Sequence, residues 1–172
     1  MTLLLLSSCG FHLRGFTEVP SWLTQVAITL NTPNRDLEPM LEEQLKAYHV
    51  RLASSPTNAL YILTIERDNL ERQITNVSAS TTPRQYLLIY SVQFSLLDNR
   101  GVVVVPSTTI SVTRQFTLNN NRILGSNYEE MTFKKEMERE AAGQIINRIS
   151  VAQKPVIIQK RAKQDETVHR AA

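Results

Sequence analysis

The strongest constraint on the fold is an unbroken two-residue alternation in the middle of the chain. Apolar side chains occupy every second position of this stretch, namely Tyr86, Leu88, Tyr90, Val92, Phe94 and Leu96. Because successive side chains of a β-strand point to opposite faces of a sheet, the pattern predicts a strand with one buried face. The turn-forming run Asp98-Asn99-Arg100-Gly101 follows, and residues 102–118 are again rich in β-branched side chains. The whole segment therefore predicts a long β-hairpin.

The second face of the predicted strand is partly polar. It carries Gln85, Ser91, Gln93 and Ser95. A sheet face of this kind meets water or a polar partner, since a second hydrophobic layer would leave these side chains without hydrogen bonds. We therefore expect one face of the sheet to hold the core and the other to lie open.

Two segments have helical spacing instead. The first, residues 34–49, has an apolar stripe formed by Leu37, Met40, Leu41, Leu45 and Tyr48. The second opens with Ser126 and Glu129, which fit a capping box, and we expect it to end near Ser150. Its stripe is formed by Phe133, Met137, Ala141, Ile145 and Ile149.

The order of the elements predicts the fold class. Short β-rich segments occur at residues 25–31 and 50–53, and a longer one begins at Tyr61. Two amphipathic helices and a sheet with one apolar face indicate an α+β fold, a two-layer sandwich in which an about four-stranded, mixed or antiparallel sheet packs against two helices. We expect one domain over residues 9–152 and a polar, disordered tail over residues 153–172.

The distribution of charge argues against a nucleic-acid binder. The last twenty residues contain five basic and two acidic side chains, which leaves 14 of each sign in the rest of the chain. A nucleic-acid-binding protein usually has a basic stripe on its folded body, interleaved with aromatic residues, and the body of this chain is neutral. We expect the tail to be solvated, although its charge could also contact anionic lipid headgroups.

Catalytic and metal-binding motifs are missing from the sequence. The three histidines lie near the two ends of the chain or at the end of a predicted helix, and no nucleophile elbow, zinc-protease motif or phosphate-binding glycine loop occurs. The single cysteine allows no disulfide and no cysteine cage for a metal. We expect no enzymatic activity, no cofactor and no metal site, although two carboxylates distant in sequence could still meet in the fold.

The head of the chain resembles the end of a bacterial export signal. Four leucines and Ser7-Ser8 precede Cys9, and Leu-Ser-Ser-Cys matches a lipobox, in which the cysteine becomes a lipid-modified N-terminus. We interpret residues 1–8 as a truncated signal peptide and Cys9 as the lipid attachment site, the alternative being a buried N-terminal strand with a chance cysteine. Gly10 replaces the aspartate that retains many lipoproteins in the inner membrane, which favours the outer membrane.

Two motifs resemble one known family. The first is Cys9-Gly10-Phe11-His12-Leu13-Arg14-Gly15, directly after the lipobox. The second combines Arg114-Gln115-Phe116, the Asn-rich loop that follows, and a helix over residues 136–145 that reads EMEREAAGQI. Both are similar to the LptE family of lipopolysaccharide-assembly lipoproteins, and the resemblance spans roughly residues 9–150.

The resemblance implies a role without catalysis. Members of the family lie inside the large outer-membrane β-barrel LptD, plug it in a 1:1 complex, help it fold, and take part in delivering lipopolysaccharide to the outer leaflet. A polar sheet face suits such a position, because the lumen of a large barrel is polar. The alternative is a free periplasm-facing lipoprotein that binds a lipid or a cell-wall fragment, which would need an enclosed apolar pocket.

The resemblance also suggests candidate residues for binding lipopolysaccharide. Phosphates on this ligand attract basic side chains, which in the family lie in the loop before the central hairpin and in the loop before the last helix. Here those loops contain Arg84 and Arg122. We expect these two arginines to contribute, with Lys134 and Lys135 as further candidates.

Overall fold

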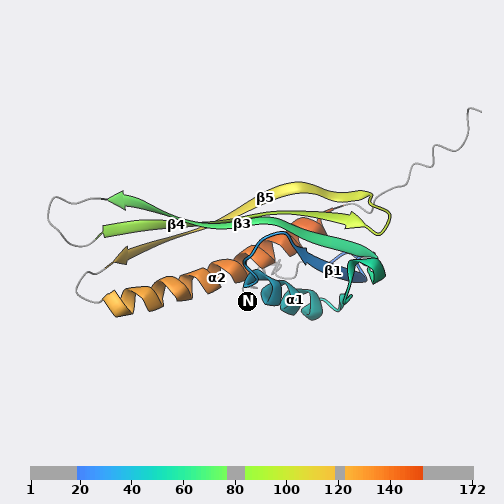
Figure 1. Ribbon diagram of the computed structural model, residues 1–172, viewed down its shortest axis with the longest axis horizontal. Coiled ribbons are helices and arrows are strands. Elements are labelled where there is room, and N and C mark those ends of the chain that lie inside the picture. Colours follow the sequence, from blue (N-terminus) through green and yellow to red (C-terminus); the bar gives the residue numbers. More distant parts are fainter. Residues whose placement is uncertain (1–18, 77–83, 119–122, 153–172) are drawn as a thin grey trace, which may run out of the picture.

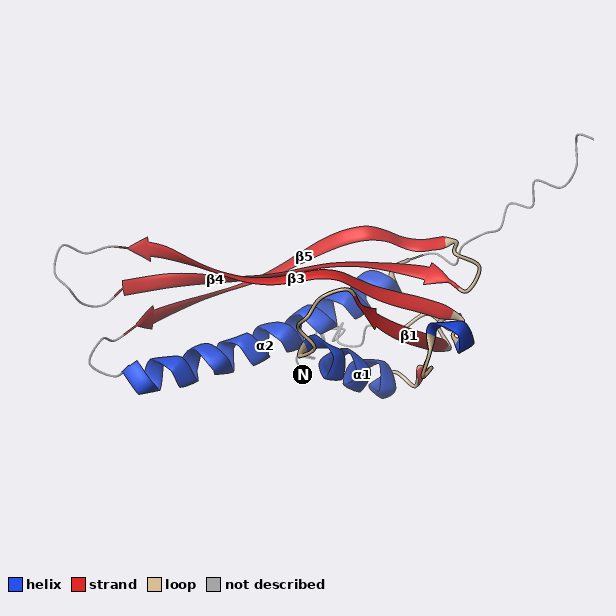
Figure 2. Ribbon diagram, in the orientation of Figure 1, coloured by secondary structure: helices blue, strands red, loops and turns tan. Residues whose placement is uncertain are grey.

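The computed structural model describes residues 19–76, 84–118 and 123–152. In chain order the elements are β1 (Gln25–Leu30), α1 (Leu37–Ala47), β2 (Arg51–Leu52), a short 3-10 helix η1 (Pro56–Asn58), β3 (Tyr61–Asn76), β4 (Arg84–Asp98), β5 (Val103–Leu118) and α2 (Ile123–Ser150). The fold is the predicted α+β sandwich, with the helices on one side of a mixed sheet (Figures 1 and 2).

The sheet has five strands instead of about four, in the order β2-β1-β3-β4-β5. The shortest strand, β2, lies within the β-rich segment expected at residues 50–53 and pairs with β1 through only two residues. β1 runs parallel to β2 and β3, whereas β3, β4 and β5 form an antiparallel meander. Because β1 pairs with β3 only from Tyr61 to Ile65, the rest of β3 has a neighbouring strand on one side only.

The core lies between the sheet and the two helices. Every apolar position of the predicted alternation in β4 is buried, and α1 adds three fully buried leucines, Leu37, Leu41 and Leu45. Burying each leucine stabilises the fold by about 1.5–3 kcal/mol relative to an exposed side chain. The apolar stripe of α2 closes the layer with Met137, Ala141, Ala142, Ile145 and Ile149.

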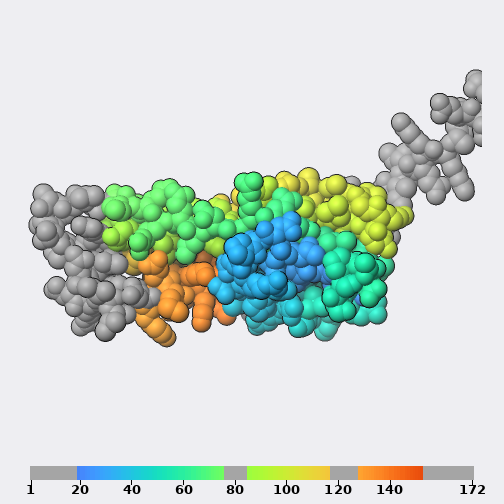
Figure 3. Space-filling model, viewed as in Figure 1, coloured from blue at the N-terminus to red at the C-terminus, as the bar shows by residue number. Residues whose placement is uncertain are grey.

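Helix α2 gives the molecule its long shape. Its 28 residues span about 42 Å at the usual rise of an α-helix. It packs against β4, β5 and α1, and the space-filling view shows its side chains directly beneath β3 (Figure 3). The helix begins at Ile123, so the prediction that Ser126 caps it was wrong: Ser126 is already inside the helix.

The β4–β5 turn is fixed by one carboxylate. Asp98 Oδ1 accepts hydrogen bonds from the backbone N–H groups of Arg100 (2.9 Å) and Val102 (2.8 Å), and Oδ2 accepts from the Arg100 guanidinium. Burial by itself would raise the pKa of Asp98, but these hydrogen bonds outweigh it and lower the pKa. Gly101 completes the turn with φ of 81°, a left-handed conformation that glycine adopts without strain.

Candidate functional site

The outer face of the sheet, which has no helix over it in the described part of the chain, presents a ladder of hydroxyl and amide groups. Two hydroxyl pairs bridge neighbouring strands at 2.9 Å, Thr29 with Thr64 and Ser91 with Ser111. Gln93 on β4 donates to Ser107 on β5 at 2.7 Å. β3, β4 and β5 extend well beyond the short strands β1 and β2 (Figure 1), and the pair of Ser91 and Ser111 lies on this extension.

One acid belongs to this ladder. Ser107 donates to the carboxylate of Glu66 at 2.6 Å. Hydrogen bonds from Ser107 and then Ser95 lower the pKa of Glu66, so this carboxylate is ionised at neutral pH. The sequence prediction of a partly polar face is confirmed for Gln85, Ser91, Gln93 and Ser95, although Leu87 and Ile89 add half-buried apolar patches between them.

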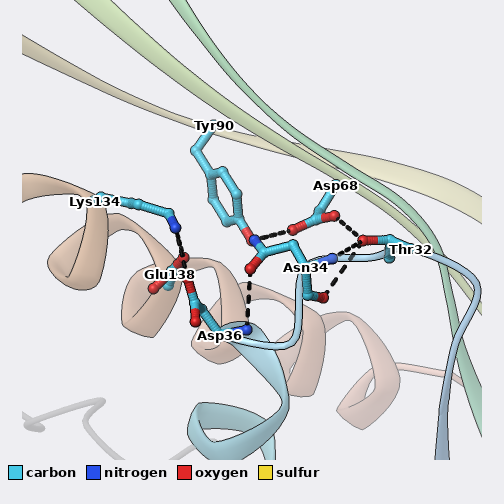
Figure 4. A network of polar contacts seen from close by, with 7 residues as sticks. All are labelled: Thr32, Asn34, Asp36, Asp68, Tyr90, Lys134 and Glu138. Atoms are coloured by element: carbon cyan, nitrogen blue, oxygen red, sulfur yellow. Dashed lines mark hydrogen bonds and ion pairs between the residues drawn. The ribbon is translucent and has the colours of Figure 1, made fainter. Parts of the chain in front are cut away.

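A second polar group lies on the other side of the sheet, where the β1–α1 loop meets β3, β4 and α2 (Figure 4). We call Thr32, Asn34, Asp68 and Tyr90 the loop cluster. Asp68 accepts hydrogen bonds from the hydroxyl of Thr32, from Nδ2 of Asn34 (2.6 Å) and from the hydroxyl of Tyr90 (3.3 Å). Burial, followed by the charge of Asp68, raises the pKa of Tyr90, which therefore stays protonated.

The position of Asp68 depends on an irregularity in β3. The register shifts between Ile65 and Arg67, so that Asp68 faces the buried residue Val92 of β4. A strict two-residue alternation from Tyr61 would have placed Asp68 on the outer face. The sequence analysis missed the loop cluster for this reason, since a β-bulge leaves no clear signal in one sequence.

Next to the loop cluster, an ion-pair group joins the two helices. The amine of Lys134 lies 2.6 Å from the carboxylate of Asp36 and 3.5 Å from Oε1 of Glu138. The hydrogen bond to Asp36 is the largest cause that raises the pKa of Lys134. Glu138 is only 1% exposed, and burial raises the pKa of its carboxyl group. The Glu138 position could have been found from its four-residue spacing to Lys134 and Ala142 on one side of α2.

A surface hollow of about 370 Å³ adjoins this group. It is lined by Pro39, Met40 and Met131 together with the charged residues Asp36, Lys134, Lys135 and Glu138. The hollow is open to solvent and four of its seven lining residues are charged, so it differs from the enclosed apolar pocket that a lipid carrier needs.

The predicted site residues are distributed over two regions. Arg84 is the first residue of β4, where it is paired in register with Leu118, the last residue of β5. This end of the sheet is therefore also where residues 119–122 connect to α2 (Figure 1). Lys134 is half-buried in its ion pairs, and Lys135 is exposed beside the hollow. Cys9 and Arg122 lie outside the described residues, as do the predicted signal remnant and tail.

The described residues contain no metal-binding group and no membrane-crossing helix. No three histidine, cysteine, aspartate or glutamate side chains among them could hold a metal ion together. Neither described helix is long and apolar enough to span a bilayer. The carboxylates that the fold does bring together already accept hydrogen bonds or pair with Lys134.

Comparison with known families matches residues 23–149 to the model of LptE, described as lipopolysaccharide-assembly. The chain belongs to the LptE family. The match covers the sheet from β1 onward and almost all of α2, and confirms the family that the sequence motifs indicated. The LPS-assembly lipoprotein LptE of Pectobacterium atrosepticum is 25% identical over 150 residues, which cover 87% of this chain and 80% of that protein. Its counterpart from Yersinia enterocolitica is 25% identical over 152 residues, 88% of this chain and 72% of that protein.

Solved structures share the LptE fold. An uncharacterised lipoprotein B of Nitrosomonas europaea superposes with a TM-score of 0.67 at 26% identity, over 82% of this chain and 90% of its own. A minor lipoprotein of Acinetobacter baumannii gives a TM-score of 0.62 at 24% identity, over 75% of this chain and 94% of its own. The long three-stranded meander beside one long helix is therefore a feature of LptE-like lipoproteins.

Proposed function

We propose that this LptE-family chain is an outer-membrane lipoprotein that docks inside the large LptD β-barrel, plugs it and helps it to assemble. On this proposal it performs no catalysis and assists the insertion of lipopolysaccharide into the outer leaflet. The observation that carries the proposal is the open outer face of the sheet, with its ladder of hydroxyl and amide groups. Such a face can form hydrogen bonds with the polar lumen of a barrel and does not need an apolar partner surface.

The free-carrier alternative has less support. A carrier of lipid or of a cell-wall fragment needs an enclosed, mostly apolar cavity. The hollow between α1 and α2 is open to solvent, and four of its seven lining residues are charged. Docking through a broad polar surface agrees better with these contacts.

A bulky side chain in the middle of the outer face tests the docking surface. Tryptophan is well tolerated in β-strands, so Gln93→Trp should preserve the sheet, but its bulk prevents a partner from approaching the ladder closely. We expect the amount of barrel isolated with this variant to fall severalfold from the wild-type amount. Glu43→Trp, on the exposed side of α1, is the matched control and should retain the barrel. Equal recovery of the barrel with both variants would contradict docking through this face.

The membrane anchor is the second part of the proposal. Cys9 carries the acyl chains, and burial of each methylene group in the membrane contributes about 0.8 kcal/mol to anchoring. In cells that lack the barrel, Cys9→Ser should therefore move the chain from the outer-membrane fraction to the soluble periplasmic fraction. A variant that stays in the membrane fraction without the barrel present would contradict an anchor at Cys9.

Lipopolysaccharide contacts form the third part. We assign them first to Arg84, the first residue of β4, and to Arg122, which lies outside the described residues, and then to Lys135 and Lys134 on α2. Lys134 is less available than the exposed Lys135, because Asp36 and Glu138 already pair with its amine. Arginine holds a phosphate through two hydrogen bonds at once, which suits residues at a loop border.

Charge reversal at chosen positions distinguishes specific arginine–phosphate contacts from the effect of the overall charge of the protein. Arg84→Glu together with Arg122→Glu should weaken the binding of purified protein to labelled lipopolysaccharide by tenfold or more, about 0.7 kcal/mol or more for each lost charge-assisted contact. Arg51→Glu together with Arg148→Glu, two exposed positions in β2 and near the end of α2, makes the same change of charge elsewhere and should bind normally. Unchanged binding by the double variant would show that the assignment is wrong.

A further inference from the structure

β5 is an unpaired edge of the sheet. It is the last strand in the sheet order, and within the described residues its only strand neighbour is β4. Half of its backbone N–H and C=O groups therefore point away from the sheet. Residues 108–118 form a run of about 36 Å with regular pairing to β4 on one side and, within the described residues, none on the other.

The other free edges of the sheet are protected against pairing. The unpaired part of β3 has register shifts near both ends and a high density of charge, contributed by Glu66, Arg67, Asp68, Glu71 and Arg72. On the opposite side of the sheet, β2 is only two residues long. Bulges, charges and short strands are the usual means by which proteins prevent association through strand edges.

β5 lacks these protections over most of its length. Its register shifts and Pro106 are confined to the end near the turn. Beyond them the only charged side chain is Arg114, and its guanidinium pairs with the carboxylate of Glu140 on α2. The exposed edge is therefore neutral and rich in residues that favour strands.

The side chains of β5 define which strand could be added. Thr109, Ser111 and Thr113 are exposed on the outer face, whereas Ile110 is half-buried and Val112 is buried on the helix side. An added strand must place small polar groups outside and β-branched apolar groups inside, and it must be uncharged. β5 itself has this pattern.

We propose that β5 pairs antiparallel with β5 of a second copy of this chain, which joins two sheets into one. When the pairing is centred on Ser111, Thr109 faces Thr113 and Arg114 faces Thr108 across the junction. When it is centred on Val112, Ser111 faces Thr113 and Arg114 faces Ile110. In both registers hydroxyl groups oppose hydroxyl or amide groups, as they already do between Ser91 and Ser111, and no like charges oppose one another.

This dimer would form in the free chain, before the chain docks in the proposed barrel. The edge of β5 adjoins the outer face, so a second copy and a surrounding partner would compete for neighbouring surface. The dimer covers the one edge that would otherwise recruit other strands, and a chain docked in a barrel no longer exposes it.

Mass measurement of the purified full chain tests the pairing. In mild detergent, native mass spectrometry and sedimentation should show a dimer that dissociates on dilution. Thr109→Lys with Thr113→Lys places like charges opposite or diagonal to each other at the junction, and should raise the dissociation constant about tenfold. Gln73→Lys with Gln85→Lys adds the same charge to exposed positions on β3 and β4 and should leave the dimer intact.

The outcomes that overturn the proposal are distinct. A chain that is monomeric over its whole soluble concentration range has no self-pairing edge, and a strand of another protein would then be the occupant. A dimer that survives the β5 lysines, or that weakens equally with the β3 and β4 lysines, forms through a different surface. None of these results affects the barrel-docking proposal, which concerns the complex with a different protein.

Discussion

Asp68 is the residue that most strongly ties the chain together at a point away from the apolar core. It accepts hydrogen bonds from Thr32 and Asn34 in the β1–α1 loop and from Tyr90 in β4. The backbone N–H groups of a loop that enters a helix need hydrogen-bond acceptors. Here the Thr32 hydroxyl and the Asn34 amide oxygen accept from such groups, and Asp68 holds both side chains in place. The start of α1 is thereby fixed to the inner face of the sheet (Figure 4).

Removal of the Asp68 carboxylate should destabilise the fold. Asp68→Ala leaves three donors in a partly buried place without an acceptor, and we expect a loss of about 2–3 kcal/mol in the free energy of unfolding measured with urea. Tyr90→Phe removes one long hydrogen bond and should cost about 1 kcal/mol or less. A loss for Asp68→Ala no greater than that for Tyr90→Phe would contradict the role of Asp68 as the common acceptor.

Glu138 should make stability depend on pH. Burial raises its pKa above the ordinary value of 4.5, so the folded chain binds this proton more tightly than the unfolded chain. The contribution of Glu138 to stability is therefore largest below that pH and is lost as the pH rises through the raised pKa.

Glu138→Gln should remove this pH dependence and increase the stability at pH 7 by about 1 kcal/mol, because no charge is then buried. Urea unfolding at several pH values provides the measurement. Glu136→Gln, an exposed neighbour in α2, should change the stability by less than about 0.5 kcal/mol. A wild-type slope retained in Glu138→Gln would assign the pH dependence to another group.

At the scale of elements, regular patterns could be predicted and irregular ones could not. The alternation in residues 86–96 predicted β4, because a buried strand face requires it, and the helical stripes predicted both helices to within a few residues at most ends. The β-rich segment at residues 50–53 indicated β2, whereas the shift near Arg67 depends on tertiary pairing, which local sequence does not encode. The early start of α2 at Ile123 likewise overrides a local capping signal at Ser126.

Two glycines provide a matched test of the elements that contain them. Gly101→Ala should destabilise the β4–β5 turn by about 1 kcal/mol, because φ is 81° there although the space around the Cβ position is open. Gly143→Ala in α2 should stabilise the chain by up to about 1 kcal/mol, since the added methyl lies 3.7 Å from the Gln44 side chain, an ordinary contact. The midpoint temperature of thermal unfolding should fall for Gly101→Ala and rise for Gly143→Ala. A shift of both midpoints in the same direction would contradict this account of the turn.

At the scale of the whole molecule, the two faces of the sheet have different roles. The inner face and the helices form one continuous core, while the outer face offers the hydroxyl and amide groups of its ladder. Figures 1 and 3 show the long body that the sheet and α2 form together. The sequence predicted this asymmetry, because polar and apolar residues alternate in β4. It could not predict the loop cluster or the ion pair of Lys134 with Asp36, since these bring together segments more than twenty positions apart in the chain.

The residues that contact lipopolysaccharide are harder to predict from the sequence than the fold is. A basic residue in a loop gives no indication of its partners until the fold is known, and the structure shows Lys134 engaged with Asp36 and Glu138. Arg84 keeps its place at the free end of the meander, next to the connection to α2. The charge-reversal experiment on Arg84 and Arg122 therefore remains the relevant test at this scale.

The most direct test of the central proposal is the composition of the complex isolated from outer membranes. The full chain, with an affinity tag at its C-terminus, is extracted with mild detergent and its partners are quantified by mass spectrometry. We expect one large β-barrel protein in an equimolar amount with the chain. Recovery of the chain without a stoichiometric barrel would contradict the proposal that it is a barrel plug.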